Sequence, residues 1–203
     1  METAEATILL VRHGHTDAIG RRLVGRLPGW HLTQEGRAQA QRLVETLGAQ
    51  PVARIYSSPL ERAIETAEPL ARARGLEVVR DEGLIEVEFG EWSGLAFDEL
   101  ARSPEWERFN TNRATANVPG GEGAAAVQVR IVATLERLAT VHRGEAIVVV
   151  SHADVIREAI LYYAGAPLAM VHRIEIAPAS VSAVALGAGE PRILFVNHRP
   201  IGR

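Results

Sequence analysis

Five side chains suited to nucleophilic and acid–base chemistry each follow a segment that the sequence predicts to be a strand. Arg12 and His13 come directly after an apolar run near the N-terminus, and His152 follows the most strand-like run of the chain. Arg62 and Glu86 come after two shorter segments of this kind. Ligands of open α/β sheets bind beyond the carboxyl ends of the parallel strands. We therefore expect the five side chains to meet at one edge of a sheet.

Two arginines, two histidines and a carboxylate in one place would suit a compact dianion such as a phosphate group. Arginine binds phosphate oxygens through charge-assisted, often bidentate bonds, and Arg62 near a helix start would add to the positive field of the exposed amides. A neutral, oriented histidine can attack phosphorus, and Glu86 or its neighbour Glu88 can supply a proton to the leaving oxygen. Taken singly, each residue also has an ordinary structural explanation, such as a surface Arg62 paired with Glu61 or Glu65. Their joint placement at strand ends favours a phosphate site.

Three other motifs point to different chemistry and are weaker. Residues 121–126 fit the dinucleotide-binding pattern G-x-G-x-x-A, but they follow a Val-Pro-Gly sequence instead of a strand. His13 and His15 form an H-x-H pair that could begin a metal site, yet further ligands are hard to find and the nearby arginines would repel a cation. No G-x-S-x-G occurs, and residues 151–154 are too close together for a serine triad. We therefore expect no metal and no cofactor.

Composition excludes several classes of enzyme and of partner. All 22 basic residues are arginine, which rules out Walker-A, Schiff-base and pyridoxal phosphate lysines, and the absence of cysteine rules out thiolate catalysis and disulfides. The net charge of −3 is too balanced for a nucleic-acid or membrane partner. The N-terminus carries no basic secretory signal, and no apolar run approaches the roughly 20 residues that span a bilayer. We expect a cytoplasmic protein.

The elements that must position these side chains alternate between strand and helix. Continuous apolar runs predict buried parallel strands, and apolar residues at helical spacing predict the helices between them. This alternation predicts a three-layer α/β/α sandwich with a mostly parallel central sheet. We expect a single domain over residues 1–203, with a small, partly helical lobe inserted at about 92–121. The predicted strands lie at 8–11, 54–57, 76–79 and 146–150, with two or three more between 171 and 197, and the predicted helices lie at 34–47, 59–75, 124–138 and 154–163.

Several helix ends have recognisable signals. Thr33 is expected to cap the first helix, and Ser58 to cap the second in a capping box with Glu61. Pro69 should kink or split that second helix, because proline lacks the backbone N–H that a helix interior uses. Asp154 is expected to cap the helix that follows His152.

Residues 11–16, with the sequence VRHGHT, resemble the R-H-G-x-[ST] signature of the histidine phosphatases, the superfamily that includes cofactor-dependent phosphoglycerate mutases. The R-H-G triplet alone is weak, but further similar segments follow in the family's order, so that the resemblance covers roughly residues 8–160. The ordered set resembles the phosphoglycerate mutase-like branch 1 of this superfamily. The further segments are 32–40, 57–67, 84–86, 119–122 and 150–152.

The resemblance implies a role for each matching residue. His13 would be the nucleophile that becomes phosphorylated, and Glu86 would be the acid and base. The chain would then hydrolyse a phosphomonoester, a small phosphorylated metabolite, through a phosphohistidine and without a metal. The phosphoryl oxygens would be held by Arg12, Thr16, Arg62 and His152.

Two positions depart from the family's pattern. Many members carry Asn where Ile19 stands, and usually Gly where Ala153 stands. The first change would weaken one phosphate contact, and neither removes a core catalytic group. Mutases of this family carry longer insertions and a C-terminal tail, so this short chain favours a phosphatase. The alternatives are a phosphomutase and a phosphate-binding scaffold that has lost turnover.

The substrate and the oligomeric state are less well specified. Residues 18–30 and 95–117 are expected to decide which phosphorylated substrate binds. An exposed edge strand near 171–176 would permit a dimer, so we expect a monomer or a homodimer. The residues that could face or attract an acidic substrate are Arg21, Arg22, Arg26, Arg113 and Glu122.

Overall fold

The computed structural model describes residues 4–48 and 50–199. Its central sheet contains β1 (Ala6–Arg12), β2 (Arg54–Ser57), β3 (Val78–Arg80), β4 (Ala146–Ser151), β5 (Val181–Leu186) and β6 (Arg192–His198). The strand order is β3-β2-β4-β1-β5-β6. β1, β2, β3 and β4 pair in parallel, whereas β5 pairs antiparallel with both β1 and β6. The expectation of a mostly parallel sheet is confirmed.

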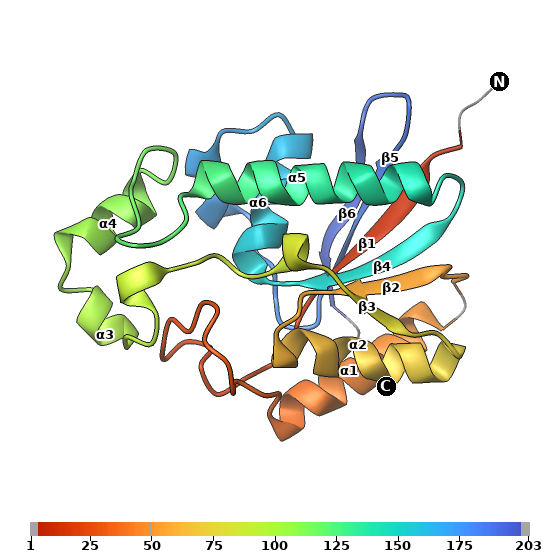
Figure 1. Cartoon of the computed structure of the whole chain (residues 1–203), viewed down its shortest axis with the longest axis horizontal. Coiled ribbons are helices and arrows are strands. Elements are labelled where there is room, and N and C mark those ends of the chain that lie inside the picture. Colours follow the sequence, from red (N-terminus) through yellow and green to blue (C-terminus); the bar gives the residue numbers. More distant parts are fainter. Residues whose placement is uncertain (1–3, 49, 200–203) are drawn as a thin grey trace.

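Helices cover both faces of the sheet, so the expected three layers are present (Figure 1). One face carries α1 and α2, and the opposite face carries α5 and α6. Two short helices, α3 and α4, lie at the end of the molecule towards which β1 and β4 run. The helices are α1 (Gln34–Leu47), α2 (Glu61–Arg74), α3 (Phe97–Leu100), α4 (Pro104–Thr111), α5 (Ala124–Val141) and α6 (Ala153–Tyr163), with 3-10 turns η1 (Glu82–Leu84), η2 (Gly90–Trp92) and η3 (Leu168–Arg173).

The continuous apolar run of β1 is explained by burial on both faces of the sheet. Ile8 and Leu10 pack into the core on the α5 and α6 side. Leu9 and Val11 pack into the core on the α1 and α2 side. All four side chains are at most 1% exposed. Because a central parallel strand has no solvent-facing side, its sequence shows no polar alternation.

Two of the expected helix caps differ in the structure. Thr33 caps α1 as expected, since its hydroxyl accepts a hydrogen bond of 3.1 Å from the Gly36 amide. α2 begins at Glu61 after Leu60, and Ser58 does not cap it. The N-cap position of α6 is His152, and Asp154 lies inside its first turn. Both side chains bind partners distant in the sequence, which compete with the local caps. Pro69 does not split α2, which runs without interruption to Arg74.

The segment between η2 and α5 is organised around aromatic rings. The ring centroids of Trp92 and Phe109 lie 5.3 Å apart, and those of Trp106 and Phe109 lie 5.6 Å apart. Offset and edge-on aromatic pairs of this kind add about 0.5–1.5 kcal/mol beyond burial. Arg22 forms an isolated antiparallel bridge with Ala96, which joins this segment to the loop after β1.

The strand expected near residues 171–176 is wrong. Residues 168–173 form the 3-10 turn η3 after Pro167, and Val171 is fully buried there. The apolar residues Val171, Ile174 and Ile176 are not spaced in strict alternation, and η3 packs against α6. The edge strand on this side is β6, where residues 194–196 are 39–47% exposed.

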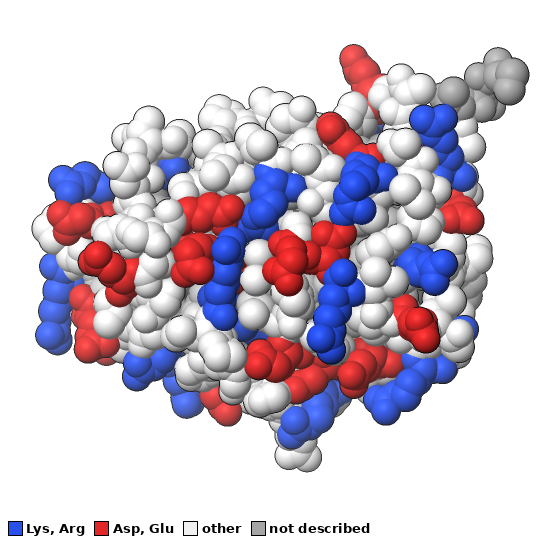
Figure 2. Space-filling model, in the orientation of Figure 1, with Lys and Arg blue, Asp and Glu red and all other residues white. Residues whose placement is uncertain are grey.

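The described residues have two further properties, one of their helices and one of their surface charge. Within the described ranges, no helix combines the length and the apolar character needed to cross a membrane. Figure 2 shows basic and acidic side chains interspersed over the face seen there, without a broad area of one sign.

Candidate active site

β1 and β4 are neighbouring parallel strands, and their carboxyl ends bring the two histidines together. The register pairs Arg12 with Ser151, so that His13 and His152 leave the sheet side by side. The centroids of the two imidazole rings lie 5.2 Å apart. His13 is 5% exposed and His152 is fully buried. The sequence-based expectation that these residues meet at one sheet edge holds in the structure.

The hydrogen bonding of His13 determines which ring nitrogen can react. Its Nδ1 lies 2.8 Å from the carbonyl oxygen of Gly14. A carbonyl oxygen can only accept, so Nδ1 carries the proton and Nε2 keeps a free lone pair. Burial, with the charges of Arg62 and Arg12, lowers the pKa of His13 well below its usual value. The ring is therefore neutral near pH 7, the state that a nucleophilic histidine requires.

Arg62 is buried and Arg12 is partly buried, and each has a buried donor without a hydrogen-bond partner. Arg62 is 1% exposed and donates from Nη2 to the Gly25 carbonyl at 2.8 Å. Arg12 donates from Nη1 to the Ile176 carbonyl at 2.6 Å. In the described part of the chain, nothing hydrogen-bonds to Arg12 Nε or to Arg62 Nε and Nη1. Buried donors without partners are costly, and an anionic ligand would satisfy them.

Burial also lowers the pKa of both arginines, that of Arg12 to about 10. With a pKa of about 10, Arg12 remains cationic at neutral pH. Arg62 is not the surface helix residue that its neighbours in the sequence would allow.

Glu86 lies beside the histidine pair with a proton affinity suited to acid–base catalysis. Its Oε1 accepts from the Val87 amide at 3.0 Å, and its Oε2 lies 3.6 Å from Nδ1 of His152. Burial and the nearby charge of Asp154 raise the pKa of Glu86 to about 7, against the opposing effect of Arg62. A carboxyl group with this pKa can both give and take a proton near neutrality.

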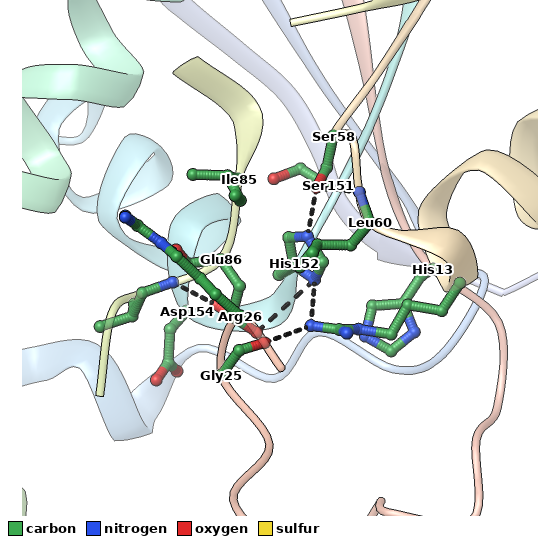
Figure 3. A network of polar contacts seen from close by, with 12 residues as sticks. His13, Gly25, Arg26, Ser58, Leu60, Ile85, Glu86, Ser151, His152 and Asp154 are labelled. Atoms are coloured by element: carbon green, nitrogen blue, oxygen red, sulfur yellow. Dashed lines mark hydrogen bonds and ion pairs between the residues drawn. The ribbon is translucent and has the colours of Figure 1, made fainter. Parts of the chain in front are cut away.

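Ser58, which the sequence predicts to cap a helix, contacts His152 instead. Its hydroxyl lies 2.8 Å from Nε2 of His152, and both residues are fully buried. Figure 3 shows His152 between Ser58 and Glu86. Nδ1 of His152 lies 3.3 Å from Arg62 Nη2, which can only donate, so the ring proton is on Nε2 and is accepted by the Ser58 hydroxyl. The signal in the sequence was the position of Ser58 directly after β2.

A cleft of about 140 Å³ opens above these residues. Thr16 and Arg22 lie on its wall, as does Ile19. Arg21 and Glu122 are not among the described residues that line the cleft. The full lining is Arg12, His13, Thr16, Ala18, Ile19, Gly20, Arg22, Leu23, Val24, Gly25, Arg62, Glu86 and Phe97.

Three residues expected to attract a substrate have structural partners instead. Arg113 is 3% exposed and pairs with Asp154 at 2.6 Å. Glu122 pairs with Arg26 at 2.9 Å, outside the cleft. Asp154, which the sequence predicts only as a helix cap, is the partner of Arg113. Its pKa is lowered to about 2, because Arg113 and then Arg157 outweigh the effect of burial. It stands as a fixed negative charge near Glu86.

Two of the three weaker motifs, the H-x-H pair and the G-x-G-x-x-A pattern, do not have the surroundings that their sites require. Across residues 4–48 and 50–199, no three His, Asp or Glu side chains gather as metal ligands would. Nδ1 of His15 lies 3.0 Å from the Thr33 hydroxyl. Residues 121–123 form the turn before α5, and no strand precedes them as a dinucleotide site requires.

Comparison with known proteins places this geometry in a family. The sequence matches the histidine phosphatase superfamily (branch 1) over residues 8–199. It is 40% identical over 157 residues to phosphoglycerate mutase-like protein 4 of Arabidopsis thaliana, covering 75% of this chain and 68% of that protein. It is 36% identical over 165 residues to the metal-independent phosphoserine phosphatase of A. thaliana, covering 77% of this chain and 68% of that protein.

A solved structure shows the same fold. The mycobacterial glucosyl-3-phosphoglycerate phosphatase Rv2419c gives a TM-score of 0.86 at 27% identity, covering 96% of this chain and 99% of that chain. The family match covers all five clustered side chains. The chain therefore belongs to branch 1 of the histidine phosphatase superfamily.

Proposed function

We propose that the protein hydrolyses phosphomonoesters of small metabolites through a phosphohistidine formed on His13. The observation that carries this proposal is the 2.8 Å contact between Nδ1 of His13 and the Gly14 carbonyl, because it keeps the ring proton on Nδ1. Nε2 is thereby left as the nucleophile beside two cations, the partly buried Arg12 and the buried Arg62.

In the first step, the phosphoryl group of the substrate lies against the free donors of Arg12 and Arg62. Nε2 of His13 attacks phosphorus and forms the N–P bond, and the bond from phosphorus to the alcohol oxygen breaks. The protonated Glu86 carboxyl gives its proton to that oxygen, so the alcohol leaves neutral. His152, whose Nδ1 accepts from Arg62 Nη2 at 3.3 Å and whose Nε2 donates to the Ser58 hydroxyl at 2.8 Å, orients Arg62 against the phosphoryl oxygens.

In the second step, water attacks the phosphohistidine. The Glu86 carboxylate takes a proton from this water as the O–P bond forms, and the N–P bond breaks. Inorganic phosphate leaves, Glu86 is protonated again and His13 returns to its neutral state. The arginine donors stabilise the charge on the phosphoryl oxygens throughout, as preorganised electrostatic stabilisation requires.

The proposed mechanism requires no metal, because Arg12 and Arg62 supply the positive charge that a cation provides in other phosphatases. The similarity to the metal-independent phosphoserine phosphatase supports this proposal. The small cleft and the names of both similar phosphatases support a small phosphorylated metabolite as substrate. Thr16 and Arg22 on the cleft wall are our candidates for further substrate contacts.

We further propose that residues 1–203 act as one catalytic unit in the cytoplasm, with residues 92–121 as a lobe beside the cleft. The contact of Phe97 with the cleft supports the place of this lobe. The nearly balanced net charge supports a small-molecule partner over nucleic acid or membrane. The unit would act as a monomer or a homodimer.

His13→Ala tests the covalent step. We expect hydrolysis of p-nitrophenyl phosphate to be abolished, while vanadate still binds weakly, because the arginine donors are retained. Acid-labile, alkali-stable phosphate should be trapped on the wild-type protein and be absent from the variant. His31→Ala is the matched control, since His31 is an exposed histidine that binds Glu65. Retention of more than a few per cent of activity in His13→Ala would assign the nucleophile elsewhere.

A further inference from the structure

Glu86 lies on a segment that has no regular secondary structure. Residues 85–89 belong to neither helix nor strand. Backbone polar groups in such a buried segment need partners from elsewhere in the molecule. Arg130 Nη1 donates to the carbonyls of Gly83 and Ile85, both at 2.9 Å. Arg26 Nε donates to the Glu86 carbonyl at 2.8 Å. Two arginine side chains therefore hold the backbone on which the proposed acid stands.

The carboxylate of Glu122 orients both arginines. Its Oε1 accepts from Arg130 Nε at 3.0 Å and its Oε2 from Arg130 Nη2 at 2.9 Å, a bidentate pair. The same Oε2 accepts from Arg26 Nη2 at 2.9 Å. Burial acts against the ionised carboxylate, but Arg130 prevails and the pKa of Glu122 lies below its usual value. Paired guanidinium groups of this kind have little freedom to turn, because the bidentate geometry fixes their plane.

The segment around Glu122 also touches the Glu86 segment backbone to backbone. The Glu122 amide donates to the Glu88 carbonyl at 2.7 Å. A Cβ added to Gly121 would lie 2.3 Å from that same carbonyl oxygen. A Cβ added to Gly90 would lie 2.1 Å from the carbonyl oxygen of Pro119. No side chain can fit between the two segments, so a shift of one moves the other.

Arg26 further connects this network with the proposed phosphate-binding residues. Gly25 precedes it in the chain, and the Gly25 carbonyl accepts from Arg62 Nη2 at 2.8 Å. Figure 3 shows Gly25 and Arg26 next to Glu86 and His152. One dipeptide thus contacts both the cation that would hold the phosphoryl group and the backbone of the acid.

We propose that Glu122 is a positioning residue that holds the Glu86 carboxyl group against His152 by orienting Arg130 and Arg26. This inference rests on the proposed function, because Glu86 must act as the acid. It also replaces the expectation that Glu122 faces the substrate. Glu122 does not line the cleft, so its loss should impair proton transfer and leave phosphate binding intact.

Glu122→Gln tests this role, because glutamine keeps the shape of the side chain and removes its charge. We expect kcat/KM for glycerol 2-phosphate, whose alkoxide leaves poorly, to fall about 10- to 100-fold, as for a displaced catalytic group. For p-nitrophenyl phosphate, whose leaving group needs little protonation, the fall should stay below about threefold. The inhibition constant of vanadate should change little. Glu105→Gln, which removes an exposed carboxylate bound to Arg108, is the control and should keep both activities.

A second variant keeps the test decisive if Glu122→Gln unfolds, which its melting temperature would show. Arg26→Lys keeps the positive charge beside Glu122 but removes the planar group that binds Glu122 and the Glu86 carbonyl together. It should show the same dependence on the leaving group. Equal losses for both esters, weaker vanadate binding, or no loss at all would overturn the positioning role. A wild-type protein that hydrolyses neither ester would instead refute the proposed function.

Discussion

At His13 and Glu86, burial acts on the pKa in opposite directions, and both shifts favour the proposed chemistry. Burial disfavours the charged form, so it lowers the pKa of the imidazole and raises that of the carboxyl group. His13 is consequently neutral, and Glu86, with a pKa of about 7, holds a proton in a good fraction of molecules near neutral pH. A nucleophile without a proton and an acid with one can coexist only because their local environments differ.

Replacement of Glu86 by glutamine tests the acid at the residue scale. Glutamine has the same shape and cannot give a proton, so we expect kcat/KM for an alkyl phosphate to fall about 10²–10⁴-fold. For p-nitrophenyl phosphate, the rate of the first step should fall by a smaller factor. Water attack on the phosphohistidine should then limit turnover. Stopped-flow measurements should therefore show a burst of nitrophenol followed by slow steady-state formation of nitrophenol. The control is Glu88→Gln, because the Glu88 carboxylate accepts from the Gly90 amide and does not line the cleft.

The pH profile checks the same assignment. Glu86 must be protonated in the first step, so kcat/KM for the alkyl phosphate should decline as the pH rises through about 7. This alkaline limb should be absent in Glu86→Gln. Equal losses for good and poor leaving groups, with an unchanged limb, would move the acid role to another carboxyl group.

At the scale of elements, the chain after α4 is joined to α6 by buried charges. Arg113 lies 2.6 Å from the Asp154 carboxylate, and its guanidinium carbon lies 3.9 Å from the centroid of the Phe109 ring. Glu158, one turn further along α6, lies 3.9 Å from Arg113 Nε and is 1% exposed. Burial raises the pKa of Glu158 to about 8, whereas the two arginines beside Asp154 keep that residue ionised. The two carboxyl groups on α6 therefore differ in charge at neutral pH, because Asp154 is ionised and Glu158 is protonated.

Glu158→Gln should change how stability depends on pH. The folded state keeps the Glu158 proton up to about pH 8, but the unfolded state loses it near 4.5, so the wild-type free energy of unfolding falls as pH rises between these values. The variant lacks this titration. Its free energy of unfolding should rise relative to the wild type by roughly 2–4 kcal/mol between about pH 5 and pH 8. Urea unfolding at both pH values measures the difference.

The control for this stability prediction is Glu107→Gln, at an exposed position of α4. It should leave the pH dependence of the free energy of unfolding unchanged. An equally steep decline in Glu158→Gln and in the wild type would show that Glu158 is already ionised in the folded protein.

At the scale of the whole molecule, positive charge reaches the site from two distant parts of the chain. Arg12 is the last residue of β1, and Arg62 lies in the first turn of α2, which follows β2. Because β1 and β2 both pair in parallel with β4, the two arginines lie beside His13. Because these cations are covalently part of the protein, we expect full activity after prolonged dialysis against EDTA. Assay of p-nitrophenyl phosphate hydrolysis before and after dialysis measures this. A loss that added zinc or magnesium restores would favour the H-x-H metal hypothesis.

Local patterns in the sequence predict much of the architecture. Burial on both faces makes β1 and β4 continuous apolar runs, and one-sided burial gives α1 and α5 their helical spacing, so these elements could be predicted with small errors at the ends. The polar residues that follow β1 and β4 could be placed at one sheet edge for the same reason. The sequence alone therefore predicts that His13 and His152 lie together.

The partners of polar groups were decided only by the tertiary structure. Ser58 has the local signature of a helix cap, yet its hydroxyl binds His152, 94 residues away. Arg113 pairs with Asp154, 41 residues away, and Glu122 binds Arg26, 96 residues away. Sequence spacing describes what a side chain can reach along its own helix or turn. Where packing brings a distant charged or buried group closer, that group competes with the local partner, and only the folded chain determines which one is bound.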